Sequence, residues 1–201
     1  MAGLGFSSGT GEFKPYVSYS AKAGKWSMKK DGVDVDIDNP TFVADLANIK
    51  TGYSYFATGR APQHIWNPSL SVKAPRPTDV DGKGKSLYKE SFLVEFFSQK
   101  NFGGVVEFTS SSQLVREAMN VLYIAYESGL AANPGKLPVV TCEGTTKTVS
   151  NVKTDAGDTK VTNYTPIFKI TSWVARPSEF DTATAANQSA APVQKASVSE
   201  F

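Results

Sequence analysis

Two residue types that often carry out catalysis occur only once each in this chain, as His64 and Cys142. A catalytic histidine needs an orienting carboxylate and usually a nucleophile, and no local motif around His64 supplies either. We expect His64 to lie in a proline-flanked surface loop, 61–68, and Cys142 to be a small buried residue at a strand end. A zinc site with two imidazoles and an internal disulfide framework are excluded. The sequence therefore predicts no enzyme and implies no cofactor.

Two other motifs suggest chemistry and fail on spacing. Asp34, Asp36 and Asp38 share one face of an extended strand, but ~6.5 Å separates successive carboxylates, too far to converge on one cation. We predict a solvated acidic face and no metal site. The segment 82–86 ends like a phosphate-binding loop, but the first glycine of that motif would have to stand at Asp79. We interpret this segment as a basic loop; its alternative role is a hairpin tip that grips phosphate.

Aromatic side chains among lysines remain as the chemical feature of this sequence, which contains 12 Phe, 8 Tyr and 3 Trp. A ring on a strand gives a nucleobase a face to stack on, worth ~1–3 kcal/mol per base, and a nearby cation follows the phosphates. Tyr53 and Tyr55 are two residues apart, so they share a strand face while Phe56 points the other way. Because aromatic residues of β-rich domains mostly lie in the core, burial is the alternative for every ring. The residues that we assign to the core are Phe92, Phe96, Phe108, Phe168 and Leu122.

Charge is close to balanced, with 21 Lys+Arg and 19 Asp+Glu among 201 residues. A net charge of +2 does not by itself indicate nucleic-acid binding. The body is mildly polarised, since 14–30 holds lysines without acids and the acids gather at 31–38. No run approaches the ~20 apolar residues of a membrane helix, and the first residues lack a secretory pattern. We expect a soluble, cytoplasmic protein without membrane contact.

The chain divides into three parts by composition. Residues 1–11 are rich in Gly and Ser and are expected to be flexible. Residues 179–201 are small and polar, so burial there would not offset the entropy of ordering, and a disordered tail is predicted. The folded, OB-like body is then 12–178.

Most of this body favours strands, because β-branched and aromatic residues alternate with polar ones. The expected strands are 15–20, 33–38, 51–56, 87–97, 104–108, 145–154, 159–164 and 166–174. The pair on either side of 155–158 is expected to form a hairpin.

One long helix is expected at 113–126, preceded by capping serines and carrying an apolar stripe that packs on the sheet. A short second helix is expected at 39–48, with Asn39 as its N-cap and Pro40 as its first residue. The predicted fold class is mainly β with one long helix, an α+β fold with a β-barrel or OB-like sheet.

Three segments resemble phage-type single-stranded DNA-binding proteins of the OB-fold kind. They are Pro15-Tyr-Val-Ser-Tyr-Ser-Ala-Lys-Ala-Gly-Lys-Trp26, Lys50-Thr-Gly-Tyr-Ser-Tyr-Phe56 and Ile170-Thr-Ser-Trp-Val-Ala-Arg-Pro177. The resemblance implies a five-stranded Greek-key barrel with an added helix, no cofactor, and a groove of aromatic residues and lysines. It also implies a C-terminal tail that recruits replication proteins. Such tails usually carry an acidic run before a terminal aromatic residue; this chain has Phe201 but no acidic run.

We therefore predict a sequence-tolerant single-stranded DNA-binding protein that acts in DNA replication or recombination of a phage or mobile element, in the host cytoplasm if phage-encoded. Bases would stack on Tyr53, Tyr55, Trp66, Tyr88 and Trp26. Phosphates would be neutralised by Lys22, Lys25, Lys50, Arg60, Lys73, Arg76, Lys83, Lys85, Lys89 and Lys100. Affinity should fall steeply with salt.

Two other interpretations stay open. The chain is alternatively a phage structural or assembly protein that uses the same aromatic residues at protein contacts, where Tyr and Trp are also enriched. The other is an enzyme whose site assembles in space around His64 and Cys142. The expected partners under the first hypothesis are single-stranded DNA and replication proteins at the tail, and a homo-oligomer is left open.

Overall fold

The computed structural model describes residues 15–57, 61–154 and 157–181, and only the backbone of residues 152–154. The predicted class, mainly β with one long helix, is confirmed. In chain order the elements are β1 (Tyr16–Ser20), β2 (Lys25–Lys30), β3 (Val33–Ile37), β4 (Thr41–Ala44), the 3-10 helix η1 (Leu46–Asn48), β5 (Lys50–Tyr55), β6 (Gln63–Trp66), β7 (Lys89–Ser98), α1 (Gln99–Phe102), β8 (Gly104–Ser110), α2 (Gln113–Leu130), β9 (Lys136–Thr154) and β10 (Gly157–Ala175). The segment expected to be flexible, 1–11, lies outside the described residues.

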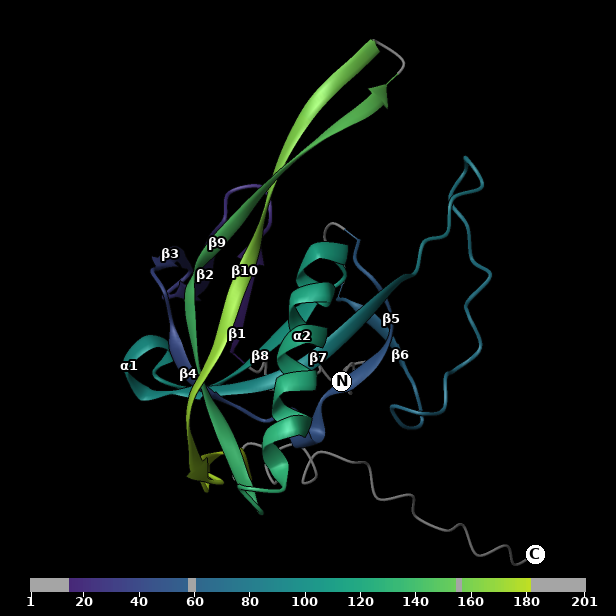
Figure 1. The fold of residues 1–201 in the computed structure, drawn as a ribbon. Helices are drawn as coiled ribbons and strands as arrows, with labels where there is room; N and C mark the ends of the chain where they lie inside the picture. Colours follow the sequence, from purple (N-terminus) through teal and green to yellow (C-terminus); the bar gives the residue numbers. More distant parts are fainter. Residues whose placement is uncertain (1–14, 58–60, 155–156, 182–201) are drawn as a thin grey trace, which may run out of the picture.

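All the described strands belong to one 10-stranded sheet, whose main path runs β10-β9-β4-β7-β8-β1-β2-β3. The sheet curls into a half-barrel, and α2 lies against it (Figure 1). β1 and β8 are parallel, and the other paired strands are antiparallel. The resemblance implied five strands, so the sheet is OB-like in its curl and larger in strand number.

β7 organises the sheet because its two halves pair with different strands along one edge. Its first half pairs with β5 and its second half with β4, while β8 pairs along the other edge. The side chains of β7 alternate as a strand requires, and Phe92, Val94 and Phe96 point into the core. This arrangement makes β5 and β6 a flap beside the main path of the sheet.

The core lies between the sheet and α2. Phe42 and Phe96 stack with ring centroids 4.0 Å apart, and Trp26 contacts Phe42, Phe108 and Phe168. The five predicted core residues are buried or packed against the buried cluster. Cys142 is buried, as predicted, and its Sγ accepts a hydrogen bond from Trp26 Nε1 at 3.3 Å.

Helix α2 buries a stripe of residues 115, 119, 122 and 126, which recur at helical spacing. At its C-terminal end Tyr126 stacks on Trp173 of β10, with centroids 5.7 Å apart. Gly129 is required at the next contact, because a Cβ there would overlap the Trp173 ring. These contacts fix the helix to β10.

No helix among the described residues is long and apolar enough to span a membrane.

The expected helix at 39–48 is wrong. Asn39 has a positive φ of 42°, and the chain then enters β4, which pairs with β9 and β7 in the middle of the sheet. Phe42 and Val43 favour a strand, and pairing on both edges outweighs the local helix-start signal. Only the 3-10 turn η1 is helical there.

The folded body also extends further than predicted. Phe180 is 0% exposed and packs against Phe97, while Arg176 lies over its ring. Arg176 Nη1 also donates to the buried carboxylate of Asp45 at 2.8 Å. The boundary expected at 179 is therefore too early, and residues 182–201 lie outside the described residues.

Candidate nucleic-acid interface

Three of the predicted stacking residues lie on one face of the β5–β7 region. Tyr53 and Tyr55 alternate with buried Ser54 along β5, and Tyr88 immediately precedes β7. The Tyr55 and Tyr88 rings are 5.7 Å apart, and both tyrosines are partly exposed, as is Tyr53. We call Tyr53, Tyr55 and Tyr88 the tyrosine face. Strand alternation places Tyr53 and Tyr55 on one side, as the sequence predicted, and the structure adds Tyr88 from the start of β7.

Trp66 lies on the opposite face of the β5–β6 ladder. It is the register partner of Gly52, which alternates with Tyr53, and it stacks on His64 with centroids 4.8 Å apart and planes 11° apart. Phe56 contacts the same His64 ring, so it points away from Tyr53 and Tyr55 as predicted. The structure therefore does not bring Trp66 together with the tyrosine face. Gly52 is required here, since a Cβ would overlap the backbone of Ile65.

Trp26 cannot be a stacking residue. It is 2% exposed, in the centre of the core, and its ring is surrounded by Tyr19, Phe108 and other aromatic residues. Its neighbouring lysines suggested a surface position. Strand alternation in β2 instead turns Trp26 and Met28 inward and the lysines outward.

The predicted cations are exposed but spread over several regions. Lys73, Arg76, Lys83 and Lys85 lie on the long segment between β6 and β7, which rises beside the flap in Figure 1. Lys50 is exposed on β5 of the flap, and Lys89 is exposed at the start of β7. Three others lie elsewhere, and these are Lys22 in the β1–β2 turn, Lys25 in β2, where it pairs with Asp36 at 2.6 Å, and Lys100 in α1. Arg60 lies outside the described residues.

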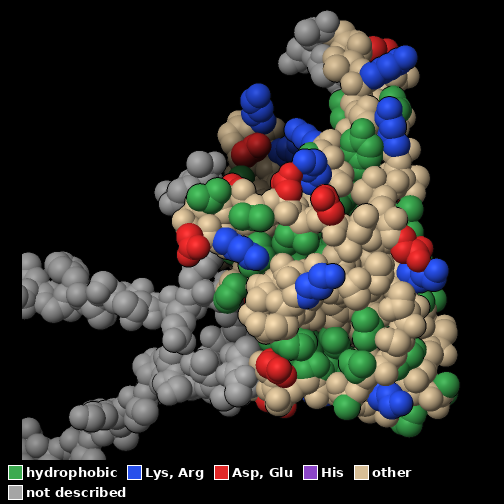
Figure 2. All heavy atoms as spheres, turned by 90° about the vertical axis from the view of Figure 1, so that its left-hand side faces the viewer, with side chains coloured by type: hydrophobic (Ala, Val, Ile, Leu, Met, Phe, Trp, Pro, Cys, Tyr) green, Lys and Arg blue, Asp and Glu red, His purple; other side chains and the backbone are tan. Residues whose placement is uncertain are grey.

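A second group of basic side chains lies away from the flap. Figure 2 shows basic side chains (blue) along the projecting β9–β10 hairpin, where Lys147 and Lys160 are exposed, and on the body next to it. Exposed basic side chains are thus found on the hairpin as well as near the tyrosine face.

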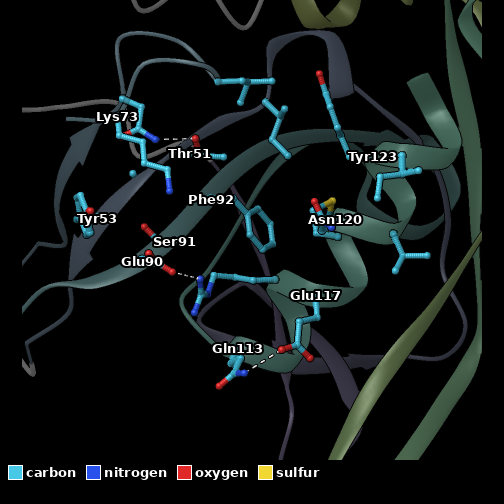
Figure 3. Close-up of a pocket in the computed structure, with 18 of the residues that line it drawn as sticks. Thr51, Tyr53, Lys73, Glu90, Ser91, Phe92, Gln113, Glu117, Asn120 and Tyr123 are labelled. Atoms are coloured by element: carbon cyan, nitrogen blue, oxygen red, sulfur yellow. Dashed lines mark hydrogen bonds and ion pairs between the residues drawn. The ribbon is translucent and has the colours of Figure 1, made fainter. Parts of the chain in front are cut away.

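A cavity of about 950 Å³ lies between the flap and α2. Tyr53 and Lys73 line it from one side, and Gln113, Asn120 and Tyr123 line it from the helix (Figure 3). Carboxylates of Glu90, Glu117 and Glu127 also line it. Its lining of rings, amides and carboxylates suits the edge of a base better than a phosphate, because carboxylates repel phosphate.

Arg116 is a cavity residue that the sequence did not reveal. Its Nη1 pairs with Glu90, and a dashed line at Glu90 in Figure 3 marks this ion pair. Its Nε is buried and finds no hydrogen-bond acceptor among the described residues. The available signal was the polar stripe 116, 120, 123 and 127, which runs along α2 beside its apolar stripe.

His64 lies on strand β6 instead of the expected loop. Its Nδ1 is 2.7 Å from Ser54 Oγ, which in turn contacts Ser91 Oγ. Burial lowers the pKa of His64 from its ordinary value, so the ring is neutral at neutral pH. Among the contacts that His64 and Ser54 make within the described residues, no carboxylate completes a catalytic triad.

The acidic strand face is exposed as predicted, at Asp34, Asp36 and Asp38. Within the described part of the chain, no group of three His, Cys, Asp or Glu residues converges on a possible metal position.

Comparisons with protein-family models, with curated proteins and with solved structures gave no match to this chain. The assignment of a function consequently rests on the geometry of the tyrosine face and of the cavity beside it.

Proposed function

We propose that this chain is a sequence-tolerant single-stranded DNA-binding protein without catalytic activity. The observation that carries the proposal is the tyrosine face, where Tyr53, Tyr55 and Tyr88 are partly exposed on one surface. Exposed aromatic rings can stack with the bases of any DNA sequence, because every base has a π-face. The family resemblance described above implies a role in the replication or recombination of phage or mobile-element DNA.

Exposed cations on the segment between β6 and β7 are available to a strand bound on this face. Lys73 lines the cavity next to Tyr53, and Lys83 and Lys85 are exposed further along the same segment. Asp81 holds the turn that carries Lys83 and Lys85, since its Oδ1 accepts from the backbone N–H groups of both lysines at 2.9 Å each. These lysines would neutralise phosphates of a strand whose bases stack on the tyrosines.

The test is a fluorescence-anisotropy titration of labelled oligo-dT, about 30 nucleotides long, at about 50 mM and about 200 mM salt. The proposal expects binding that weakens steeply with salt and changes little when dT is replaced by dA or dC. Tryptophan quenching is a poor readout, because Trp26 is buried and Trp66 faces away from the tyrosines. Absence of binding at low salt, or binding insensitive to salt, would refute the proposal.

A protein-contact role is the second candidate, and a specific surface favours it. Val121 and Ile124 of α2 are 67% and 54% exposed beside the cavity, and Leu70 is exposed across from them. Apolar side chains gathered in this way are typical of a protein interface. Light scattering after size exclusion separates the two candidates, since a structural protein forms a discrete oligomer and does not bind the oligonucleotide.

A further inference from the structure

A two-stranded ribbon projects from the body of the molecule. Beyond Thr145 and Pro166, strands β9 and β10 pair only with each other, in continuous register from Thr146↔Thr165 to Thr154↔Gly157. Figure 1 shows this ribbon rising clear of α2 and of the other strands. We call the described residues of this ribbon, 147–154 and 157–164, the arm. Isolated two-stranded ribbons are marginally stable in water, so an arm of this length indicates a binding role.

The base of the arm is held rigidly. The Tyr164 N–H donates to Ala21 O at 2.7 Å, and Tyr19 Oη donates to Tyr164 O at 3.1 Å. The Tyr164 ring packs over Gly24, where a Cβ would stand 2.9 Å from its Cγ. The β1–β2 turn therefore braces the base of the arm against the body, which favours a geometric role over that of a loose tether.

The surface chemistry of the arm is that of a phosphate-binding element. Lys147 and Lys160 are exposed, and Asp158 is the one acidic residue among the arm's described residues. Most other arm side chains carry hydroxyl or amide groups, which donate to phosphate oxygens. These are Thr148, Ser150, Asn151, Thr159, Thr162 and Asn163. Lys22 adds a further exposed cation at the base, next to Ala21.

The same chemistry argues against a protein partner and against a single strand. Among the arm's described side chains, Val149 is the one large apolar side chain that is mostly exposed, at 53%. Protein interfaces need a group of apolar or aromatic anchors. Single-strand binding needs exposed rings, and the one described ring of the arm, Tyr164, packs on Gly24.

We propose that the arm binds double-stranded DNA without sequence preference, by lying in the major groove and contacting the phosphates on both sides. The major groove, ~12 Å wide, admits a two-stranded β-ribbon. The arm's strands, from Lys147 to Thr154, extend ~23 Å, about two thirds of the ~34 Å turn of the duplex. A chain that also carried a single strand on its tyrosine face would prefer a junction between single- and double-stranded DNA.

Two variants test the arm. In the first, 148–163 are replaced by Asn-Gly, which closes the ribbon with a two-residue turn and keeps the Lys147–Tyr164 pair and the packing on Gly24. The second carries Lys147→Gln and Lys160→Gln in the intact arm. The matched control, Lys136→Gln with Lys169→Gln, removes the same charge from exposed positions of β9 and β10 outside the arm.

The probes are a blunt duplex of about 20 base pairs and an oligo-dT of about 30 nucleotides, each labelled and titrated by anisotropy. For both arm variants we expect duplex affinity to fall ~10-fold or more at low salt, and for the lysine variant the log–log salt slope to drop by about 2. Affinity for oligo-dT and both affinities of the control should stay within about twofold of wild type.

Three outcomes would overturn the inference: no duplex binding by the wild type, unchanged duplex binding by the shortened arm, or an equal loss for oligo-dT and duplex. Light scattering is run in parallel, and loss of an oligomer with unchanged duplex binding would assign the arm to a protein contact. The single-strand proposal fails separately, when the wild type binds the duplex but not oligo-dT.

Discussion

The rings of Tyr55 and Tyr88 lie 5.7 Å apart with their planes inclined by 45°, although 33 positions separate them in the chain. Tyr88 Oη donates to Gln63 Oε1 at 2.8 Å, and Gln63 is the register partner of Tyr55. Tyr55 of β5 and Gln63 of β6 therefore meet Tyr88, at the start of β7, in one cluster. This contact orients both rings before any ligand binds, which lowers the ordering cost of stacking.

Removing either ring should weaken single-strand binding. Tyr55→Ala and Tyr88→Ala should each lower oligo-dT affinity by about 5- to 150-fold, because each removes one stacking platform worth ~1–3 kcal/mol. Anisotropy titration measures the loss. Tyr55→Phe keeps the ring and should bind like wild type. Phe56→Ala is the matched control, since Phe56 is exposed on the opposite face beside His64. An equal loss from Phe56→Ala would contradict the assignment of the face.

The lysines between β6 and β7 should set the salt dependence. Lys83→Gln combined with Lys85→Gln removes two exposed cations and leaves the backbone contacts to Asp81 intact. The slope of log affinity for oligo-dT against log salt should become shallower by about 1.4, because ~0.7 counterion is released per single-strand phosphate contact. An unchanged slope would show that these lysines do not touch the phosphates. Lys136→Gln, at the start of β9, is the single-charge control.

Stability should fall on mild acidification through His64. Burial lowers the pKa of this histidine in the folded chain below its ordinary value of 6.5, so the unfolded chain takes up a proton at higher pH than the folded chain does. The contribution of the neutral, buried His64 ring to the free energy of unfolding is therefore complete above the ordinary pKa of 6.5. It is lost as the pH falls through the lower pKa of His64 in the folded chain. We expect the free energy of unfolding to drop between about pH 7.5 and about pH 5, and to drop less in His64→Gln. Urea denaturation at both pH values measures this; equal drops in the two proteins would contradict it.

The buried carboxylate of Asp45 should make Arg176 a sensitive position. Asp45 is 2% exposed and accepts from Arg176 Nη1 at 2.8 Å and from Asn48 Nδ2 at 2.9 Å. Arg176→Met leaves the carboxylate without its cation, and we expect a loss of about 3 kcal/mol in the free energy of unfolding. Lys25→Met breaks an exposed pair with Asp36 and should cost only a small part of that. Equal costs in urea denaturation would contradict the importance of burial.

The sequence revealed those parts of the fold in which a local pattern and tertiary packing agree. Phe92 and Phe96 in β7 alternate with less buried residues, and the stripe on α2 has helical spacing, so both were predictable. The position of β4 was not predictable from the sequence, because Asn39-Pro40 is a local helix-start signal. Only the pairing of β4 with β7 and β9 overrides this signal.

The candidate site was predictable in part for the same reason. Tyr53 and Tyr55 share a face by strand alternation alone. Trp66 was misplaced because its side depends on the register of β6 against β5, and the proline-flanked segment around it gives no sign of a strand. Trp26 was misplaced because its lysine neighbours on β2 hide an inward-facing position. Arg116 belongs to the cavity only because α2 packs beside the flap, which local spacing does not encode.

The central claim is that DNA bases lie against Tyr53, Tyr55 and Tyr88, and photocrosslinking tests it most directly. An oligo-dT that contains 5-iododeoxyuridine is irradiated in complex with the full chain, and the crosslinked residues are located by mass spectrometry of the digested protein. The account predicts crosslinks at these three tyrosines, each lost when its own tyrosine is replaced by alanine. Crosslinks at Trp66 or on the arm, with none on the tyrosine face, would contradict it.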